Sequence, residues 1–320
     1  MADGRITQAE KENVVIKAGA CSVTLLPHIG GKISSIRINN QELLQTPLAA
    51  LKPRTRTMPF NASDASGWDE CLPSVSACTV KTAAGPADVP DHGDLWRVAW
   101  ESISPNNGNS VSLRSKCFSL PLTLERGLSL TEMTKGWQIR LDYKLTNTGG
   151  HATPWSWAAH PLFAVDPGDT IVLPKSVATT RLEGSGGGRL GATDDVVAWP
   201  HASLPQGGST DLAVVQSPQS GIGDKLFAGP LASDANWCEL HRPKAGVRIR
   251  VRFDSAATPY LGLWLCYGGW PNGPGPRQYC VALEPATAPV DSLAQTGSWS
   301  RTLQPGRSDS WPMLVDIEIM

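Results

Sequence analysis

The 320-residue chain lacks the features that mark several large classes of protein. It has no apolar stretch long enough to span a bilayer, and its polar first ten residues contain no signal-peptide core. Lys and Arg (28) nearly balance Asp and Glu (29), so the formal net charge is −1. No basic face for nucleic acid or membrane headgroups is evident. We therefore expect a cytoplasmic protein that binds neither nucleic acid nor membranes.

Cysteine is scarce and scattered. The chain has seven cysteines, an odd number that forms no evident disulfide framework. Cys71 and Cys78 are the closest pair, but their spacing matches no usual zinc motif. His92 and His160 have no obvious third partner for a metal site. We expect reduced thiols and no bound metal.

Other catalytic templates are also missing. The glycine-rich run at residues 184–189 lacks the Gly-Lys-Ser/Thr ending of a phosphate-binding loop and the strand–helix setting of a dinucleotide site. No Gly-x-Ser-x-Gly elbow occurs in the sequence. These absences argue against a nucleotide-binding role and against a serine hydrolase of the α/β type.

No amphipathic helix of useful length is present, and period-two alternation takes its place. The 31 Gly and 26 Pro residues are enough to punctuate many turns. The pattern predicts an all-β fold, a large antiparallel β-sandwich forming a single domain over residues 1–320. We expect residues 45–90 and 182–222 to be long loops. The predicted strands are residues 14–16, 21–26, 32–38, 42–44, 138–146, 246–253, 260–265, 279–283 and 313–319.

Tryptophan is abundant where other aromatic residues are few. Twelve Trp accompany four Tyr and five Phe. An indole face can stack on the axial C–H bonds of a sugar ring, although Trp also fills the core of a large sandwich. We expect most of the twelve to be core residues and a few to contact a ligand.

Three residues combine a titratable group with an apolar setting. Glu284 ends the apolar run 279–283, where lost hydration would raise its pKa toward the range of a general base. His160 follows small and aromatic residues at 155–159, which favours a partly desolvated imidazole. His92 stands where a loop enters a predicted strand.

Ordered pieces of the chain resemble the aldose 1-epimerases, or galactose mutarotases, and their wider superfamily. His92-Gly93 is similar to the first histidine motif of that family, and Asn147 followed by His160-Pro161-Leu162-Phe163 to the second. Leu283-Glu284-Pro285 with Asp291 downstream resembles the segment that carries the glutamate base. Further similar pieces are residues 28–35 with 41–44, residues 263–264, and Leu303-Gln304-Pro305-Gly306.

The resemblance implies a chemistry and a set of roles. Glu284 would be the base, His160 the acid, and His92 a group that binds the sugar. Asp69, Trp68 and Trp96 are candidates for substrate binding in the pocket wall. The substrate would be a small-molecule sugar, no cofactor is required, and the protein would be a monomer or homodimer.

The chain departs from the family pattern at two places. The substrate-binding Arg in an Asn-Arg context is missing, and residues 67–73 resemble more distant members instead. The substrate-binding Asp has no clear match, with Asp224 and Asp234 as candidates. Sugar-ring chemistry is therefore better supported than glucose or galactose as the substrate.

Three alternatives remain open. The first is a carbohydrate-binding protein without catalysis. The second is an epimerase or isomerase of a phosphorylated sugar or a uronate, with Arg54, Arg56 or Arg97 at the cleft mouth. The third is a glycosidase with Asp69 or Glu70 opposite Glu284.

Overall fold

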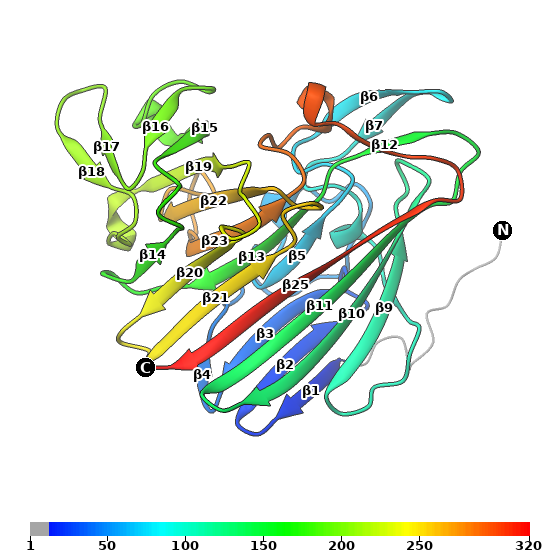
Figure 1. The fold of residues 1–320 in the computed structure, drawn as a ribbon, viewed down its shortest axis with the longest axis horizontal. Coiled ribbons are helices and arrows are strands. Elements are labelled where there is room, and N and C mark those ends of the chain that lie inside the picture. The colour runs from blue at the N-terminus through cyan, green and yellow to red at the C-terminus, as the bar shows by residue number, and fades with distance from the viewer. Residues whose placement is uncertain (1–12) are drawn as a thin grey trace.

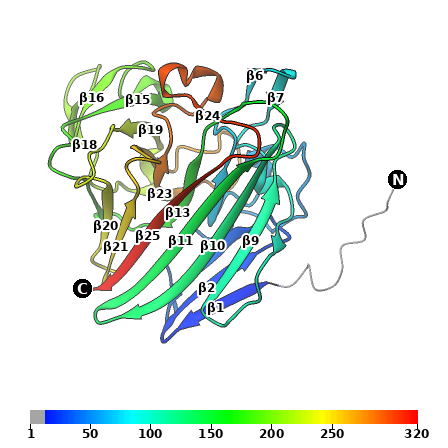
Figure 2. The same ribbon diagram turned by 45° about the vertical axis from the view of Figure 1, so that its right-hand side comes forward.

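The computed structural model describes residues 13–320 and contains two large antiparallel sheets that face each other (Figures 1 and 2). The first sheet has eleven strands in the order β1-β2-β3-β5-β13-β23-β22-β19-β15-β16, with β4 paired to β3. These strands are β1 (Val14–Ala18), β2 (Cys21–Leu26), β3 (Lys32–Ile38), β4 (Gln41–Glu42), β5 (Trp68–Cys71), β13 (Ala158–Ala164), β15 (Thr179–Ser185), β16 (Val196–Ala198), β19 (Ile222–Ala228), β22 (Tyr260–Tyr267) and β23 (Tyr279–Ala286).

The second sheet has eight strands in the order β14-β20-β21-β25-β11-β10-β9-β8. Its long strands cross the front of the molecule in Figure 1. They are β8 (Glu101–Ser102), β9 (Ser110–Lys116), β10 (Leu122–Met133), β11 (Gly136–Asn147), β14 (Thr170–Val172), β20 (Trp237–Arg242), β21 (Val247–Phe253) and β25 (Ser308–Ile319).

Short two-stranded ribbons and 3₁₀ turns complete the described part of the chain. The ribbons are β6 (Cys78–Thr82) with β7 (Gly85–Val89), β12 (Thr153–Trp155) with β24 (Arg301–Leu303), and β17 (His201–Ser203) with β18 (Ser209–Asp211). Every helix among residues 13–320 is a three-residue 3₁₀ turn: η2 (Phe60–Ala62), η3 (Leu95–Arg97), η4 (Gly186–Gly188), η5 (Pro218–Ser220), η6 (Leu293–Gln295) and η7 (Gly297–Trp299). None is long and apolar enough to cross a membrane.

The core lies between the two sheets. Successive side chains of a strand point to opposite faces, so alternate residues of each strand enter it. Leu261, Leu263 and Leu283 of the first sheet and Leu141 and Ile317 of the second belong to one buried apolar cluster. The residues between them on β22 and β23, such as 262 and 284, therefore face away from the second sheet.

The predicted all-β fold class is confirmed, and all of the predicted strands lie in the sheets or at their ends. The loop prediction for residues 45–90 was wrong in part, because β5 is an interior strand of the first sheet and β6 and β7 form a hairpin. Residues 182–222 likewise contain the end of β15, the strand β16 and the β17–β18 ribbon. Both segments are Gly- or Pro-rich, which hides strands this short. All seven cysteines are free, as expected.

Candidate active site

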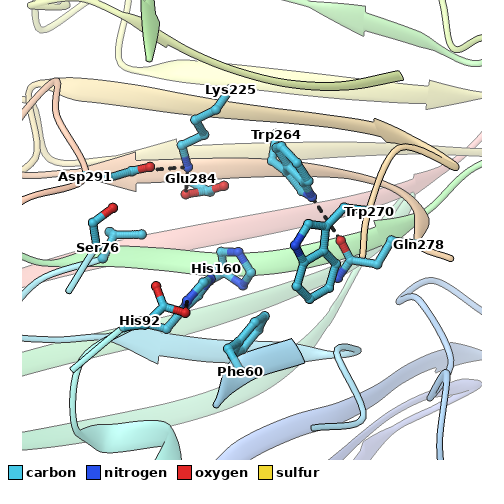
Figure 3. Close-up of a pocket in the computed structure, with 12 residues that line it drawn as sticks. Phe60, Ser76, His92, His160, Lys225, Trp264, Trp270, Gln278, Glu284 and Asp291 are labelled. Carbon is cyan, nitrogen blue, oxygen red and sulfur yellow. Dashed lines mark hydrogen bonds and ion pairs between the residues drawn. The ribbon is translucent and has the colours of Figure 1, made fainter. Parts of the chain in front are cut away.

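A small cavity opens on the outer face of the first sheet, the face turned away from the second (Figure 3). Its volume is about 150 Å³. Drug-sized sites are typically about 300–1,000 Å³, so this one suits a single small ligand. The walls combine aromatic rings with imidazole and carboxylate groups. They are formed by Phe60, Val75, Ser76, Asp91, His92, His160, Lys225, Trp264, Trp270, Gln278, Glu284 and Asp291.

Strand register places His160 and Glu284 together. β13 and β23 are antiparallel, with Ala158 opposite Ala286 and Leu162 opposite Ala282. Positions 160 and 284 fall midway between these pairs, so their side chains stand opposite each other on one face. Opposed side chains of an antiparallel pair have Cβ atoms roughly 5 Å apart. Two residues far apart in sequence thus meet at the cavity.

His92 lies in a tight turn in which the next position, 93, must be glycine. His92 and Gly93 both have left-handed backbone conformations, with φ of 58° and 68°. A Cβ on Gly93 would lie 2.2 Å from the carbonyl oxygen of Leu72, so the turn requires glycine. The turn brings the His92 ring to 5.3 Å from that of His160, at 84° to it.

Phe60 fixes the two imidazoles. Its ring stacks on His92 with centroids 3.7 Å apart and planes within 4°, and it meets His160 edge-on at 5.7 Å. Asp91 Oδ2 lies 3.0 Å from His92 Nδ1. These contacts leave the His92 ring little freedom to turn.

Glu284 is fully buried and has an ammonium partner. Burial raises the pKa of its carboxyl group, while the neighbouring Lys225 lowers it and Asp291 raises it further. Lys225 Nζ donates to Glu284 Oε2 and lies 3.7 Å from Asp291 Oδ1. Figure 3 shows the lysine extending toward both carboxylates. Glu284 Oε1 is buried and has no hydrogen-bond partner among the described residues.

The imidazole of His160 is buried at the cavity. Burial lowers the pKa of the imidazole well below its ordinary value, and the nearby His92, Lys225 and Lys32 lower it further. Its Nδ1 atom is buried without a partner among residues 13–320. Glu284 Oε1 and His160 Nδ1 thus both belong to lining residues and make no hydrogen bond within the described part of the chain, and a polar ligand could satisfy such atoms.

Two indoles complete the apolar part of the wall. Trp264 donates from Nε1 to Gln278 Oε1 at 3.0 Å, and Gln278 Nε2 donates to the Ala65 carbonyl oxygen at 3.1 Å. Trp270 lies 6.0 Å from Phe60 between ring centroids. Aromatic faces beside a few oriented polar groups are the usual lining of a small-molecule site.

The structure corrects the predicted pocket wall. Trp68, Asp69 and Trp96 do not line this cavity. Trp68 is fully buried and belongs to the core between the sheets. Because neighbouring residues of a strand point to opposite faces, Asp69 is the one that faces outward. Asp69 is opposite His160 in register, but its carboxylate is bound by Lys32 Nζ at 2.6 Å.

The remaining candidates are also engaged elsewhere. Trp96 is fully buried behind Phe60, with ring centroids 5.2 Å apart. Asp224 is buried and accepts hydrogen bonds from Ser185 and Arg189, and Asp234 is an exposed residue of a turn. Neither carboxylate lines the cavity.

The sequence did not identify Lys225, Phe60 or Trp270 as residues of the site. Lys225 follows Asp224 in the middle of an otherwise apolar strand, Ile222–Ala228, and that placement of two charges is a usable signal. Phe60 and Trp270 come from irregular segments, where no periodicity indicates which way a side chain points. No group of three or more His, Cys, Asp or Glu suited to a metal ion occurs among residues 13–320.

No protein-family model and no curated protein matches the chain. Solved structures match it over nearly its whole length. The Slr1438 protein from Synechocystis sp. PCC 6803 has a TM-score of 0.71 and 17% identity, with 100% of each chain covered. A galactose mutarotase-like protein from Lactobacillus casei ATCC 334 has a TM-score of 0.67 and 15% identity, with 96% of this chain and 100% of that one covered.

The GalM/aldose epimerase homologue from C. elegans has a TM-score of 0.63 and 12% identity, with 97% of this chain and 99% of that one covered. Identities this low establish the architecture and not the activity. The match over both chains nevertheless extends through both sheets and the strands that carry the cavity. The chain therefore has the galactose mutarotase-like fold.

Proposed function

We propose that this protein interconverts the anomers of a sugar, as an aldose 1-epimerase does. One observation carries the proposal: Glu284, His160 and His92, far apart in sequence, line the same small cavity. Neighbours of the same fold that are described as mutarotase-like and as an aldose epimerase homologue support the same class of reaction.

The chemistry needs one base and one acid. Glu284 Oε1 removes the proton of the anomeric hydroxyl, the C1=O bond forms, and the C1–O5 bond breaks as His160 protonates the ring oxygen. Rotation about C1–C2 turns the aldehyde over. In reclosure His160 takes the proton back from the O5 hydroxyl and Glu284 returns its proton to the carbonyl oxygen, so the pair ends as it began.

The pair must hold one proton for this cycle to run. Burial favours the uncharged form of both groups, since it raises the pKa of Glu284 and lowers that of His160. Such opposed shifts bring the two proton affinities closer together, which is what a proton shuttle between them requires. His92, fixed by Phe60 and Asp91, would donate to or accept from a sugar hydroxyl.

The test is Glu284→Gln, which keeps the shape of the side chain and removes the base. We expect a loss of rate of about 10²- to 10⁴-fold with the fold intact. Anomer exchange of a panel of aldoses is followed by polarimetry and NMR. Glu101→Gln, at an exposed residue of the other sheet, is the control and should keep full activity. A Glu284→Gln protein as active as the wild type would reject the assignment.

The same panel separates catalysis from binding alone. A wild-type protein that binds a sugar but leaves its anomer exchange at the buffer rate would be a carbohydrate-binding protein. The alternative of a phosphorylated sugar or uronate finds little support in the charges of the cavity. Lys225 is the only Lys or Arg among the described lining residues, and it already faces two carboxylates.

The arginines that a phosphate would need are engaged elsewhere. Arg97 donates to the carbonyl oxygens of residues 58, 91 and 93, and Arg54 is paired with Asp64. Arg56 is exposed and stacks over Phe118. A neutral sugar therefore fits the site better than a charged one, and sugar phosphates and uronates belong in the panel as the comparison.

A paired-carboxylate glycosidase fits less well. Such an enzyme needs a second free carboxyl group facing the first across the scissile bond. Glu70 lies on the core face of β5, where its carboxylate accepts from Arg126, Tyr143 and Trp157, and Asp69 is bound by Lys32. Neither residue is available to act opposite Glu284.

A further inference from the structure

Lys225 contacts Glu284 across an intervening strand, β22. Lys225 on β19 is the register partner of Trp264, and Phe227, two residues on, is the partner of Gly262. Gly262 is in turn the partner of Glu284 on the far side of β22. The lysine therefore starts two strands away from the glutamate and reaches it diagonally across β22.

The ammonium group is clamped between two carboxylates. It donates to Glu284 Oε2, lies 3.7 Å from Asp291 Oδ1, and lies 5.2 Å from the ring centroid of Phe227. Asp291 is itself fixed, because its carbonyl oxygen accepts from the amides of Val75 and Ser76, and its own amide donates to Glu183. Lys225 is 8% exposed and so cannot turn away into solvent.

The two oxygens of Glu284 differ as a result. Oε2 is occupied by the ammonium group, and Oε1 is buried in the cavity wall with no partner among the described residues. A buried carboxylate without a cation nearby would take up a proton and could not serve as a base. A cation at one oxygen both opposes that uptake and selects which oxygen faces the ligand.

Building on the proposed function, we propose that Lys225 is a positioning residue for the base. Its ammonium group holds Glu284 Oε2, opposes protonation of the carboxylate, and leaves Oε1 for the anomeric hydroxyl of the sugar. Lys225 is not a nucleophile toward the open-chain aldehyde in this arrangement. Burial lowers the pKa of its amine, but Asp291 and Glu284 outweigh burial and raise it, so the amine stays protonated.

The experiment compares Lys225→Met, Lys225→Arg and Asp291→Asn with the wild type, and Lys144→Met, on an exposed position of β11, is the control. For each protein kcat and KM are measured across pH, and near-UV circular dichroism checks the fold. In Lys225→Met we expect kcat to fall at least about tenfold near neutral pH with KM within about twofold. The acid limb of kcat/KM should move up by about one pH unit or more, because a nearby cation lowers a carboxyl pKa by that order.

The other variants sharpen the test. Lys225→Arg should recover most of the rate, since it keeps the positive charge. Asp291→Asn should move the acid limb to lower pH, because the Asp291 charge raises the pKa of Glu284. Opposite shifts from two neighbours of one carboxylate would not arise from loosened packing. A loss in Lys225→Met that is equal at every pH, or an unmoved acid limb, would overturn the proposal.

A readout independent of activity separates this inference from the proposed function. The carboxyl group of Glu284 is followed by infrared difference titration, with Glu284→Gln identifying its band. A higher titration midpoint in Lys225→Met supports the positioning role even if no aldose tested is turned over, in which case only the proposed function fails. An unchanged midpoint in a folded, active Lys225→Met protein rejects the role of Lys225. A covalent adduct between Lys225 and the sugar, trapped by cyanoborohydride in the wild type, would also reject it.

Discussion

Gly262 is the register partner of Glu284 on the neighbouring strand β22, and its missing side chain leaves the space that the glutamate occupies. A Cβ atom at position 262 would lie 3.2 Å from Glu284 Cβ and 3.3 Å from Oε2. It would also lie 3.2 Å from a ring carbon of Phe227. The space above Gly262 is therefore bounded by the glutamate and by the ring of Phe227, and a side chain at position 262 would press on both.

We therefore expect Gly262→Ala to impair catalysis more than folding. A methyl group there displaces the carboxylate by a few tenths of an ångström or more, and small misplacements of a reacting group cost up to about 100-fold in rate. The predicted result is a fall in kcat of about 10- to 100-fold, with the unfolding temperature lowered by only a few degrees. Anomer exchange and thermal unfolding measure the two effects.

Gly127→Ala is the matched control for this prediction. Gly127 also lies within a strand, β10 of the second sheet, but a Cβ there would meet nothing closer than 3.6 Å. Its activity should equal that of the wild type. If Gly262→Ala were fully active, the fine placement of Glu284 would not limit the reaction.

Many of the strands were predictable from the sequence, whereas others and much of the cavity wall were not. Period-two alternation is a local property, and it found the strand that Glu284 borders but not β13, the strand on which His160 lies. It does not say which of two alternating faces is the core. Trp68 and Asp69 illustrate the ambiguity: they are adjacent on β5, so they cannot both face the cavity, and Trp68 takes the core side.

Local sequence patterns could not predict which distant strands pair with each other. Nothing near Lys225 in the sequence indicates that β19 lies two strands from β23, and that arrangement alone explains the Lys225–Glu284 contact. Phe60 and Trp270 come from irregular segments whose direction depends on the completed fold. The sequence motifs pointed to His160 and Glu284, which line one cavity, whereas the groups that surround them there required the tertiary structure.

The pH dependence of kcat/KM is the second prediction. The base is active when Glu284 has lost its proton, and burial raises its pKa above the ordinary 4.5. The acid is active while His160 holds a proton, and burial lowers its pKa well below the ordinary 6.5. Activity should therefore rise with pH through an apparent pKa above 4.5 and fall again through one below 6.5.

The expected profile is a narrow bell on the acid side of neutrality, measured with sugar well below KM so that the free protein is reported. Both apparent values belong to the coupled Glu284–His160 pair. A profile with no alkaline limb would show that His160 is not the proton donor. In that case His92 becomes the next imidazole to test by substitution.

The third prediction concerns the ion pair that joins the two sheets beneath the site. Glu70 on β5 and Arg126 on β10 are both buried, with Oε1 and Nη1 2.9 Å apart. The carboxylate also accepts from Tyr143 and Trp157. Removing one partner of a buried pair leaves the other charge uncompensated and costs about 3–5 kcal/mol.

Arg126→Met should therefore lower the free energy of unfolding by about 3–5 kcal/mol at neutral pH, measured by urea denaturation.

The loss of stability in Arg126→Met should become smaller on acidification. Burial raises the pKa of Glu70 in the folded protein, and loss of the arginine removes the main group that opposes this rise. Folded Glu70 then binds a proton that the unfolded chain has released, so stability is lost as pH rises above about 4.5 toward the raised value. Arg140→Met is the control: Arg140 and its partner Asp142 are both exposed on β11, so this change should cost no more than about 1 kcal/mol at any pH. A penalty for Arg126→Met that is equally small, or that does not change with pH, would mean that the pair contributes little to holding the sheets together.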